Sequence, residues 1–404
     1  MRILMIAPEP FFQPRGTPFS EYYRTRALTE LGHEVDMVTY PIGEDVSIPG
    51  LRIFRAPGIP GIRKISIGPS LAKLPLDAMV FSSAVRRLMS GRYDLLDCHE
   101  EAGLMGVLLS KLFGVPAVYD MHSSLPEQLV NFRYTRSAVL RKLFAILERW
   151  TIKGSAAVIV ICPYLQEVVA DVDPEKPCFL IENSPLAEAN RVAGSEEATA
   201  LRKSLGLEGT AVIGYTGTFH AYQGLDLLFD AVRWIAERDP KARLLMVGGH
   251  PDQIDEARGA IQQRGLEDKV VFVGQRPPAE MSVYLAATDV LVSPRSHGNN
   301  TPLKIYSYLR AGKAIVATRL LTHTQVLDDE ISQLTAADPE AFGKGILTLL
   351  RDPNRAQALG EAARRRAENE YSYENYLEKT RRVLDFLSRT AEPEQAVPSQ
   401  APSK

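Results

Sequence analysis

The sequence predicts an α/β protein made of two Rossmann-like, doubly wound domains. Short runs of Val, Ile and Leu recur along the chain with helix-length segments between them, as buried parallel strands require. These runs form two sets, and each set begins with a strand followed by a loop that contains glycine. The chain of 404 residues is long enough for two domains of ordinary size.

Seven strands are expected in the first half of the chain. The first lies in MRILMIAPEP, whose apolar run is too short for a signal peptide. The predicted strands are residues 3–7, 35–39, 51–54, 95–98, 117–120, 157–161 and 179–181. We expect them to form a first domain at residues 1–185, which ends where apolar periodicity is lost.

The second half predicts five strands and a helical C-terminal part. The strands are residues 212–215, 243–247, 270–273, 290–292 and 314–317, and helical patterns follow at 339–350, 353–370 and 373–389. We therefore expect a second domain at 186–370 and a C-terminal helix at 371–390. Residues 391–404 are rich in Pro, Ala, Ser and Gln, and we expect a disordered tail there.

Composition excludes several classes of protein. A net charge of −2 argues against nucleic-acid binding, and 45% hydrophobic with 24% charged residues is typical of a globular protein. No apolar run approaches the roughly 20 residues that span a bilayer. The three cysteines form neither a disulfide framework nor a metal-ligand pattern. These features predict a cytoplasmic protein without a metal cofactor.

The segment VLVSPRSHGNNTPLKIYSYLRAGKAIVAT, residues 290–318, carries the clearest functional signal. A strand runs into a polar loop, a helix begins near Pro302 and ends at Gly312, and a second strand follows. Thr301 is placed to cap that helix. Lys304 lies in its first turn, where a cation opposes the helix dipole unless an anion such as phosphate is bound. The alternative is an ordinary βαβ unit with a solvated loop.

Glycines mark the ends of other strands in the second half. Gly217 follows one strand and Gly224 precedes an amphipathic helix, so both allow a phosphate to approach the backbone closely. Their spacing does not match G-x-G-x-x-G, which argues against a nicotinamide or flavin cofactor. Gly249 and Gly274 end two further strands. Because these ends meet at one edge of a parallel sheet, we expect a ligand site there.

Short motifs follow one another in a fixed order from residue 2 to about residue 387. They are MRILMIAPEP, LTELGHEVDMVTY, YDLLDCHE, VYDMHSS, VIVICPYLQEVV, IENSP, IGYTGTFHAYQGLDLL, LLMVGG, VVFVGQRPPAEM and SPR…NNTPLKIYSYLRAGKAIVAT. Their order and spacing resemble those of the family 4 glycosyltransferases. The resemblance implies the GT-B fold, in which two Rossmann-like domains face each other across a cleft and a C-terminal helix crosses back. It also implies transfer with retention of configuration.

The same resemblance implies roles for individual residues. Gly16 would let the first loop approach the donor diphosphate and the acceptor, and His122 would face the transferring sugar as the catalytic residue. A buried imidazole with satisfied hydrogen bonds is the alternative for His122. The residues that would present backbone amides to the sugar and the pyrophosphate are Asn299, Asn300, Thr301 and Leu303.

Four positions of the donor site depart from the family's pattern: Thr218, Gln223, Asn299 and Ser307. The first two stand where the family commonly has the Arg and Lys that grip phosphates. The last two stand where it has glutamates for the sugar and the ribose. Each lost ionic contact is worth about 1.5–3 kcal/mol. We expect Lys304, one turn before Ser307, or Arg295 to restore the positive charge.

On the acceptor side, a cluster of Asp97, His99, Glu100 and Glu101 lies at the end of one strand. Glu100 or Glu101 is a candidate for orienting the acceptor, and ordinary surface charge is the alternative. The resemblance implies that no side-chain nucleophile is needed, because the departing phosphate acts as the base. The protein would stabilise the leaving diphosphate and exclude water.

Basic and apolar residues alternate in a predicted helix of the first half. They are Phe132, Arg133, Arg136, Val139, Leu140, Arg141, Lys142, Leu143, Phe144, Leu147, Arg149, Trp150 and Lys153. Such a helix can lie on an anionic membrane surface, which would suit a lipid-linked acceptor. The alternative is a core-facing helix with snorkelling arginines.

The sequence thus predicts a glycosyltransferase that moves a sugar from a nucleotide-sugar donor to a glycan or lipid-linked acceptor. A peripheral position on the inner face of the membrane is an alternative to a purely cytoplasmic one. Two other functions stay open: a sugar-nucleotide epimerase on the same fold, and a degenerate glycosyltransferase that binds without turnover. The nucleotide base, the sugar, the acceptor and the oligomeric state are not predicted.

Overall fold

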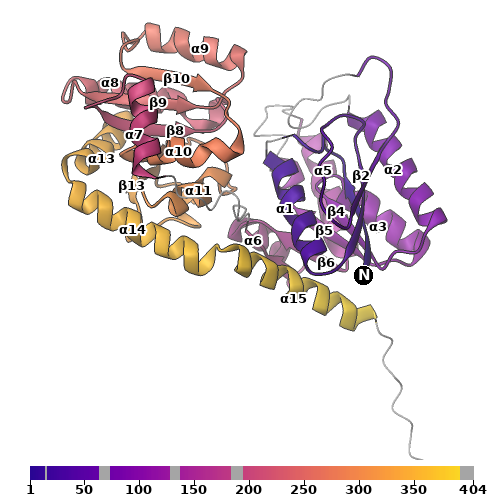
Figure 1. The fold of residues 1–404 in the computed structure, drawn as a ribbon. Coiled ribbons are helices and arrows are strands. Elements are labelled where there is room, and N and C mark those ends of the chain that lie inside the picture. The colour runs from indigo at the N-terminus through magenta and orange to yellow at the C-terminus, as the bar shows by residue number, and fades with distance from the viewer. Residues whose placement is uncertain (14–15, 63–72, 128–136, 183–193, 392–404) are drawn as a thin grey trace, which may run out of the picture.

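The computed structural model of the protein describes residues 1–13, 16–62, 73–127, 137–182 and 194–391. It confirms the predicted fold class, since two parallel sheets with flanking helices lie side by side (Figure 1). The predicted boundary at 185/186 and the tail beyond 391 fall outside these residues and stay predictions. Among the described residues, no helix combines the length and the apolar character needed to cross a bilayer.

The first sheet has the strand order β3-β2-β1-β4-β5-β6-β7. All seven strands were expected, with ends shifted by one residue or so. Their bounds are β1 Arg2–Ala7, β2 Glu34–Thr39, β3 Leu51–Arg55, β4 Leu95–His99, β5 Ala117–Met121, β6 Ala157–Val160 and β7 Cys178–Leu180. The described helices of this domain are α1 Gly16–Glu30, α2 Lys73–Ser90, α3 Ala102–Phe113, α5 Ala138–Gly154 and α6 Pro163–Val172.

The second sheet has the order β10-β9-β8-β11-β12-β13. Its strands are β8 Ala211–Thr216, β9 Ala242–Val247, β10 Val270–Gly274, β11 Val290–Ser293, β12 Ala314–Thr318 and β13 Gln333–Thr335. The sequence prediction missed β13, because a three-residue edge strand gives no periodicity to detect. The helices are α7 Ser195–Ser204, α8 Leu225–Ala236, α9 Pro251–Gln262, α10 Met281–Ala286, α11 Leu303–Ala311, α12 Leu321–Thr324, α13 Pro339–Arg351, α14 Pro353–Glu370 and α15 Tyr373–Ala391.

Both sheets place a topological switch point near the middle. Chain order reverses between β1 and β4 in the first sheet and between β8 and β11 in the second. Helices leave such neighbouring strands on opposite faces, so a crevice opens beyond their carboxyl ends. The loops after β4 and β11 carry Glu100 and Asn299, two of the predicted site residues.

The helix that follows Pro302 begins as expected, but Thr301 does not cap it. The N-cap position of α11 is Pro302, and no side chain makes a capping hydrogen bond there. The prediction of a Thr301 cap is therefore wrong. Within this turn the Ile305 N–H donates to the Pro302 carbonyl oxygen over 3.0 Å, and no side chain occupies the helix N-terminus as a cap.

The C-terminal helix α15 crosses back to the first domain, as the resemblance implied (Figure 1). Its apolar stripe joins the core on the face of the first sheet that also receives α1, through Tyr376, Val383, Leu384 and Leu387. At the edges of this contact, Tyr373 Oη donates to Glu30 Oε2 over 2.9 Å, and Lys379 pairs with Glu182. The helix is thus part of the first domain's core.

We expect the Leu387→Ala variant to destabilise the first domain. Leu387 is 1% exposed, and emptying such a site costs about 2–4 kcal/mol of unfolding free energy. Trp150 in α5 and Trp234 in α8 are the two tryptophans of the chain. Urea unfolding in a Trp234→Phe background would therefore report on the first domain alone. The exposed Arg381→Ala change on the same helix is the control, and an unchanged midpoint for Leu387→Ala would contradict this packing.

Candidate active site

The predicted donor-binding glycines meet the loop of α11 at the carboxyl edge of the second sheet. Gly224 has a φ of 74°, and a Cβ built on it would lie 1.9 Å from the carbonyl oxygen of Pro294. Gly217 has a φ of 132°, and a Cβ there would lie 3.3 Å from Lys304 Nζ. Only glycine fits both positions without strain. The structure therefore brings together Gly217, Gly224 and Lys304.

Two partly buried cations at this edge, Lys304 and Arg295, have no carboxylate partner among the described residues. Lys304 Nζ has no hydrogen-bond acceptor there and lies 4.0 Å from the centre of the Tyr215 ring. Burial, and then the nearby Arg295, lower the pKa of Lys304 well below its usual value. Burial also lowers the pKa of Arg295. Two like charges kept close together without an anion define a site that an anion would stabilise.

Arg295 is fixed by the loop it belongs to. One guanidinium nitrogen donates to the carbonyl oxygen of Asn300 over 2.6 Å and to Thr322 Oγ1 over 2.8 Å. The guanidinium also lies 5.1 Å above the Tyr222 ring, in the loop before Gly224. These contacts hold the side chain toward the glycine loop.

Asn299 reaches across to the first domain. Its side-chain amide donates to Glu127 Oε1 over 2.7 Å, and Tyr164 Oη donates to the same carboxylate. The Gln325 side chain donates to the carbonyl oxygen of Asn299 over 2.6 Å and accepts from the Tyr164 backbone N–H over 2.7 Å. Glu127 thus places a carboxylate next to the position where the family has a glutamate. Sequence reasoning missed Glu127, because it lies in the other domain.

Asn300 joins the second domain to His122. Its side-chain amide donates to the backbone carbonyl oxygen of His122 over 2.7 Å. The predicted catalytic residue and the predicted donor loop are therefore in direct contact.

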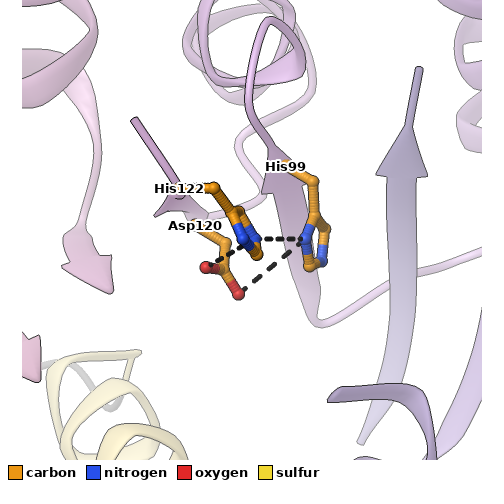
Figure 2. Close-up of side chains that lie close together, drawn as sticks. All are labelled: His99, Asp120 and His122. Carbon is orange, nitrogen blue, oxygen red and sulfur yellow. Dashed lines mark hydrogen bonds and ion pairs between the residues drawn. The ribbon is translucent and has the colours of Figure 1, made fainter. Parts of the chain in front are cut away.

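His122 belongs to a buried polar cluster with His99 and Asp120 (Figure 2). His122 Nε2 lies 3.2 Å from Asp120 Oδ1 and 3.3 Å from His99 Nδ1. Arg24 in α1 donates from Nε and Nη2 to Asp120 Oδ2, over 3.1 and 3.0 Å. Arg24 Nη1 donates to Thr380 in α15 over 3.3 Å. The sequence analysis named His99 and His122 but not Arg24 or Asp120.

The pKa values of Asp120, His122 and His99 are shifted in different directions. Burial would raise the pKa of Asp120, but Arg24 and then His122 outweigh it and hold that pKa well below the usual range. Burial alone would lower the pKa of His122, but Asp120 and Glu100 raise it overall. Burial lowers the pKa of His99 to about 3. His122 is therefore the imidazole that takes up the proton, and Asp120 is its counter-ion.

The atoms of His99, Asp120 and His122 that could bind a metal lie within 4.8 Å of one another. The Arg24 guanidinium already occupies Asp120 Oδ2 with two hydrogen bonds and brings a positive charge to the cluster. A cation would meet that charge at close range. The residues fit a hydrogen-bonded ion pair better than a metal centre, and the expectation of no metal cofactor stays a prediction.

The acceptor-side candidates lie at the carboxyl edge of the first sheet. Glu100 is buried and has a φ of 49°, which is rare for a residue other than glycine, and Ser123 Oγ donates to both its carboxylate oxygens. Glu101 Oε1 lies 3.3 Å from Lys73 Nζ, which also contacts Glu9 at 3.3 Å. Surface charge is therefore the wrong interpretation for Glu100, which is enclosed.

Other predicted site residues make fewer contacts. Gly16 begins α1 with a φ of 42°, and a Cβ there would meet nothing within 4 Å. Gln223 is buried, and its Oε1 has no partner among the described residues. The Thr218 carbonyl oxygen accepts from Tyr215 Oη over 2.7 Å. The roles of Thr301, Leu303 and Ser307 stay predictions. Thr301 is buried, whereas Leu303 and Ser307, both in α11, are partly exposed.

Comparison with known protein families gives matches in both domains. The model described as "Glycosyl transferase 4-like domain" matches residues 24–179, and that described as "Glycosyl transferases group 1" matches residues 210–352. The chain is 26% identical to phosphatidyl-myo-inositol mannosyltransferase of Mycobacterium leprae (strain TN), over 91% of this chain and 92% of that protein. It is also 26% identical to 2-deoxystreptamine glucosyltransferase of Streptomyces kanamyceticus, over 68% and 73% of the two chains.

Solved structures share the fold over nearly the whole length. Sucrose-phosphate synthase from Thermosynechococcus elongatus superposes with a TM-score of 0.82 at 21% identity, covering 96% of this chain and all of that one. HepE from Anabaena, solved in complex with UDP, gives a TM-score of 0.75 at 18% identity, covering 95% and 100%. Since both of its domains match the models of one enzyme family and the fold agrees throughout, this chain belongs to the group 1 (family 4) glycosyltransferases.

Proposed function

We propose that this glycosyltransferase uses a nucleotide-sugar donor and transfers the sugar with retention of configuration. The observation that carries the proposal is the pair of partly buried cations, Lys304 and Arg295, which have no carboxylate partner among the described residues and lie beside Gly217 and Gly224. A diphosphate would satisfy both cations and the free N–H groups at the start of α11. Lys304 and Arg295 would then do the work of the family's Arg and Lys, whose positions hold Thr218 and Gln223.

The transfer needs no nucleophile from the protein. The acceptor hydroxyl attacks the anomeric carbon on the face from which the nucleotide leaves. The bond from that carbon to the phosphate oxygen breaks, the glycosidic bond forms, and the hydroxyl proton passes to the departing phosphate. Lys304 and Arg295 stabilise the charge that develops on the diphosphate. With two protein cations in place, we expect the reaction to run without a divalent ion.

His122 would serve as a charged hydrogen-bond donor to the transferring sugar. Its pKa is raised by Asp120, which favours the protonated form, while Asn300 holds its backbone against the donor loop. Glu127, bound to Asn299, offers a carboxylate in place of the family's missing glutamate. This supports turnover and disfavours the degenerate alternative.

The acceptor is proposed to be a glycan or a lipid-linked molecule. The mycobacterial relative acts, by its name, on phosphatidyl-myo-inositol, and the streptomycete relative on 2-deoxystreptamine. HepE is a fold neighbour solved with UDP, which makes UDP the first nucleotide to test. Family membership gives no support to the epimerase alternative, and we expect no nucleic-acid partner.

A membrane-facing surface is proposed on α5. Val139, Leu143 and Ile146 are spaced to share one face of this helix and are 77%, 47% and 55% exposed. These three side chains therefore do not face the core, as the alternative of a core-facing helix would require. Lys142 and Arg149 lie on the same helix and are exposed, and Leu112 of the neighbouring α3 is 70% exposed. Phe132, Arg133 and Arg136, which were part of the prediction, lie outside the described residues.

Replacing Lys304 by Met should separate donor binding from folding. We expect UDP affinity to fall at least about tenfold, because one charge-assisted contact is worth 1.5–3 kcal/mol. The melting temperature without ligand should stay the same or rise, because an unpaired buried charge is removed. Calorimetric titration with UDP and thermal unfolding measure the two effects. Lys344→Met, a change of an exposed lysine in α13, is the control. Unchanged UDP affinity in Lys304→Met would refute the donor site.

The pH profile tests the role of His122. If its protonated form is active, kcat/KM falls as pH rises through its raised pKa. The Asp120→Asn variant removes the main cause of the raised pKa, so the alkaline limb should move to lower pH. Burial also raises the pKa of Asp97 to about 7 and of Glu100 to about 8. Following the His122 ring protons by NMR identifies its own titration, and an unmoved alkaline limb speaks against this role.

Vesicle binding tests the α5 surface. We expect the protein to sediment with phosphatidylglycerol vesicles at low salt, and the Leu143→Glu/Ile146→Glu variant to bind at least about tenfold more weakly. Leu321→Glu changes an exposed leucine in the second domain and serves as the control. If the unchanged protein and both variants sediment equally, or if none of them sediments with the vesicles, this surface is excluded.

A further inference from the structure

We propose that His99 is a positioning residue for His122, and that Asp97 fixes the tautomer of His99 that this role requires. The inference rests on the proposed function, because it concerns how His122 is presented to the transferring sugar. It gives a role to two buried side chains that take no other part in the transfer.

The backbone of two neighbouring strands places these side chains together. Asp97 and His99 are two residues apart in β4, so their side chains lie on the same face of the sheet. In β5, Asp120 pairs with His99 in register, and His122 follows two residues later. Figure 2 shows the His99 ring beside the His122 ring, and the ring centres are 5.5 Å apart.

The contact between the two imidazoles needs one donor and one acceptor. His99 Nδ1 lies 3.3 Å from His122 Nε2, and Asp120 Oδ1 lies 3.2 Å from the same His122 nitrogen. A proton on His122 Nε2 therefore meets an acceptor in both directions. His99 Nδ1 must then be bare, and because a neutral imidazole carries one N–H group, the proton of His99 is on Nε2.

Two buried atoms support this tautomer of His99. His99 Nε2 and Asp97 Oδ1 face each other over 3.6 Å, and neither has a hydrogen-bond partner in the part of the chain that the structure describes. An N–H group on Nε2 would satisfy both atoms after a small movement, since buried polar groups are normally paired. The opposite tautomer would direct its N–H group toward Asp120 Oδ2, which is 3.8 Å away and already accepts two hydrogen bonds from Arg24.

The consequence concerns which nitrogen of His122 meets the ligand. Its Nε2 is held by His99 and Asp120, whereas no described residue bonds to its Nδ1. Protonated His122 would therefore donate from Nδ1 to an oxygen of the transferring sugar. Burial keeps His99 neutral by lowering its pKa to about 3, so His99 stays an acceptor while His122 carries the charge.

The tautomer of His99 is tested by NMR on the full chain labelled with ¹⁵N-histidine. Two-bond ¹H–¹⁵N correlation spectra distinguish protonated ring nitrogens from bare ones, and loss of signals in His99→Asn and His122→Asn assigns the two rings. We expect His99 to be neutral near neutral pH, with its proton on Nε2. A proton on Nδ1, or a charged His99, would overturn the proposal.

Asn and Leu at position 99 form a matched pair of variants. Their side chains have the same shape, but only Asn offers an acceptor oxygen near the place of Nδ1. We expect kcat for the release of UDP from UDP-glucose to be at least about tenfold lower in His99→Leu than in His99→Asn. The affinity for UDP, measured by calorimetric titration, should differ less than about twofold between them. A merely structural role predicts equal kcat values, because both variants leave the same cavity, and that result would contradict the inference.

The two measurements separate this inference from the proposed function. If UDP does not bind, or if the unchanged protein does not turn over UDP-glucose, the proposed donor is in error, and the tautomer of His99 still decides the inference. The same spectra decide it if either variant fails to fold, because they are recorded on the unchanged protein.

Discussion

The ion pair between Arg24 and Asp120 is the interaction on which the site depends most. It is buried on both sides, and it connects α1, the end of β5 and, through Thr380, the returning helix α15. A buried charge without its partner is strongly destabilising, so each of these elements has to be in place before Asp120 can orient His122. The geometry of the predicted catalytic residue is therefore set by segments far apart in the chain.

The two domains contribute opposite charges to the region where they meet. The first domain supplies carboxylates at its sheet edge, and the second supplies cations beside its glycine loops. Side-chain amides of the second domain make contacts with the first domain: Asn300 bonds to the His122 carbonyl oxygen, Gln325 accepts from the Tyr164 N–H, and Asn299 bonds to the Glu127 carboxylate. Amide contacts can form and break at little cost, because water can replace them. Lys304, whose Nζ has no hydrogen-bond acceptor among the described residues, is left for a ligand.

Much of this architecture could be predicted from the sequence. Parallel strands are continuous apolar runs, so twelve of the strands and the helices near Pro302, Pro339 and Pro353 were apparent. The short edge strand β13 and the missing cap at Thr301 were not, because three residues show no period and Pro302 itself occupies the N-cap position of α11. Lys304 was found because a cation in a first helical turn is out of place. Arg24, Asp120 and Glu127 were missed, because pairing across distant segments leaves no local pattern.

The position of α15 has a consequence for how the protein is made. The first domain emerges from the ribosome early, yet one face of its sheet is completed by Tyr376, Val383, Leu384 and Leu387, which follow the whole second domain. During synthesis the part of that face that α15 covers stays exposed while the second domain is translated and folds. The nascent chain must therefore be protected from aggregation over this interval, and the first domain matures last although it is made first.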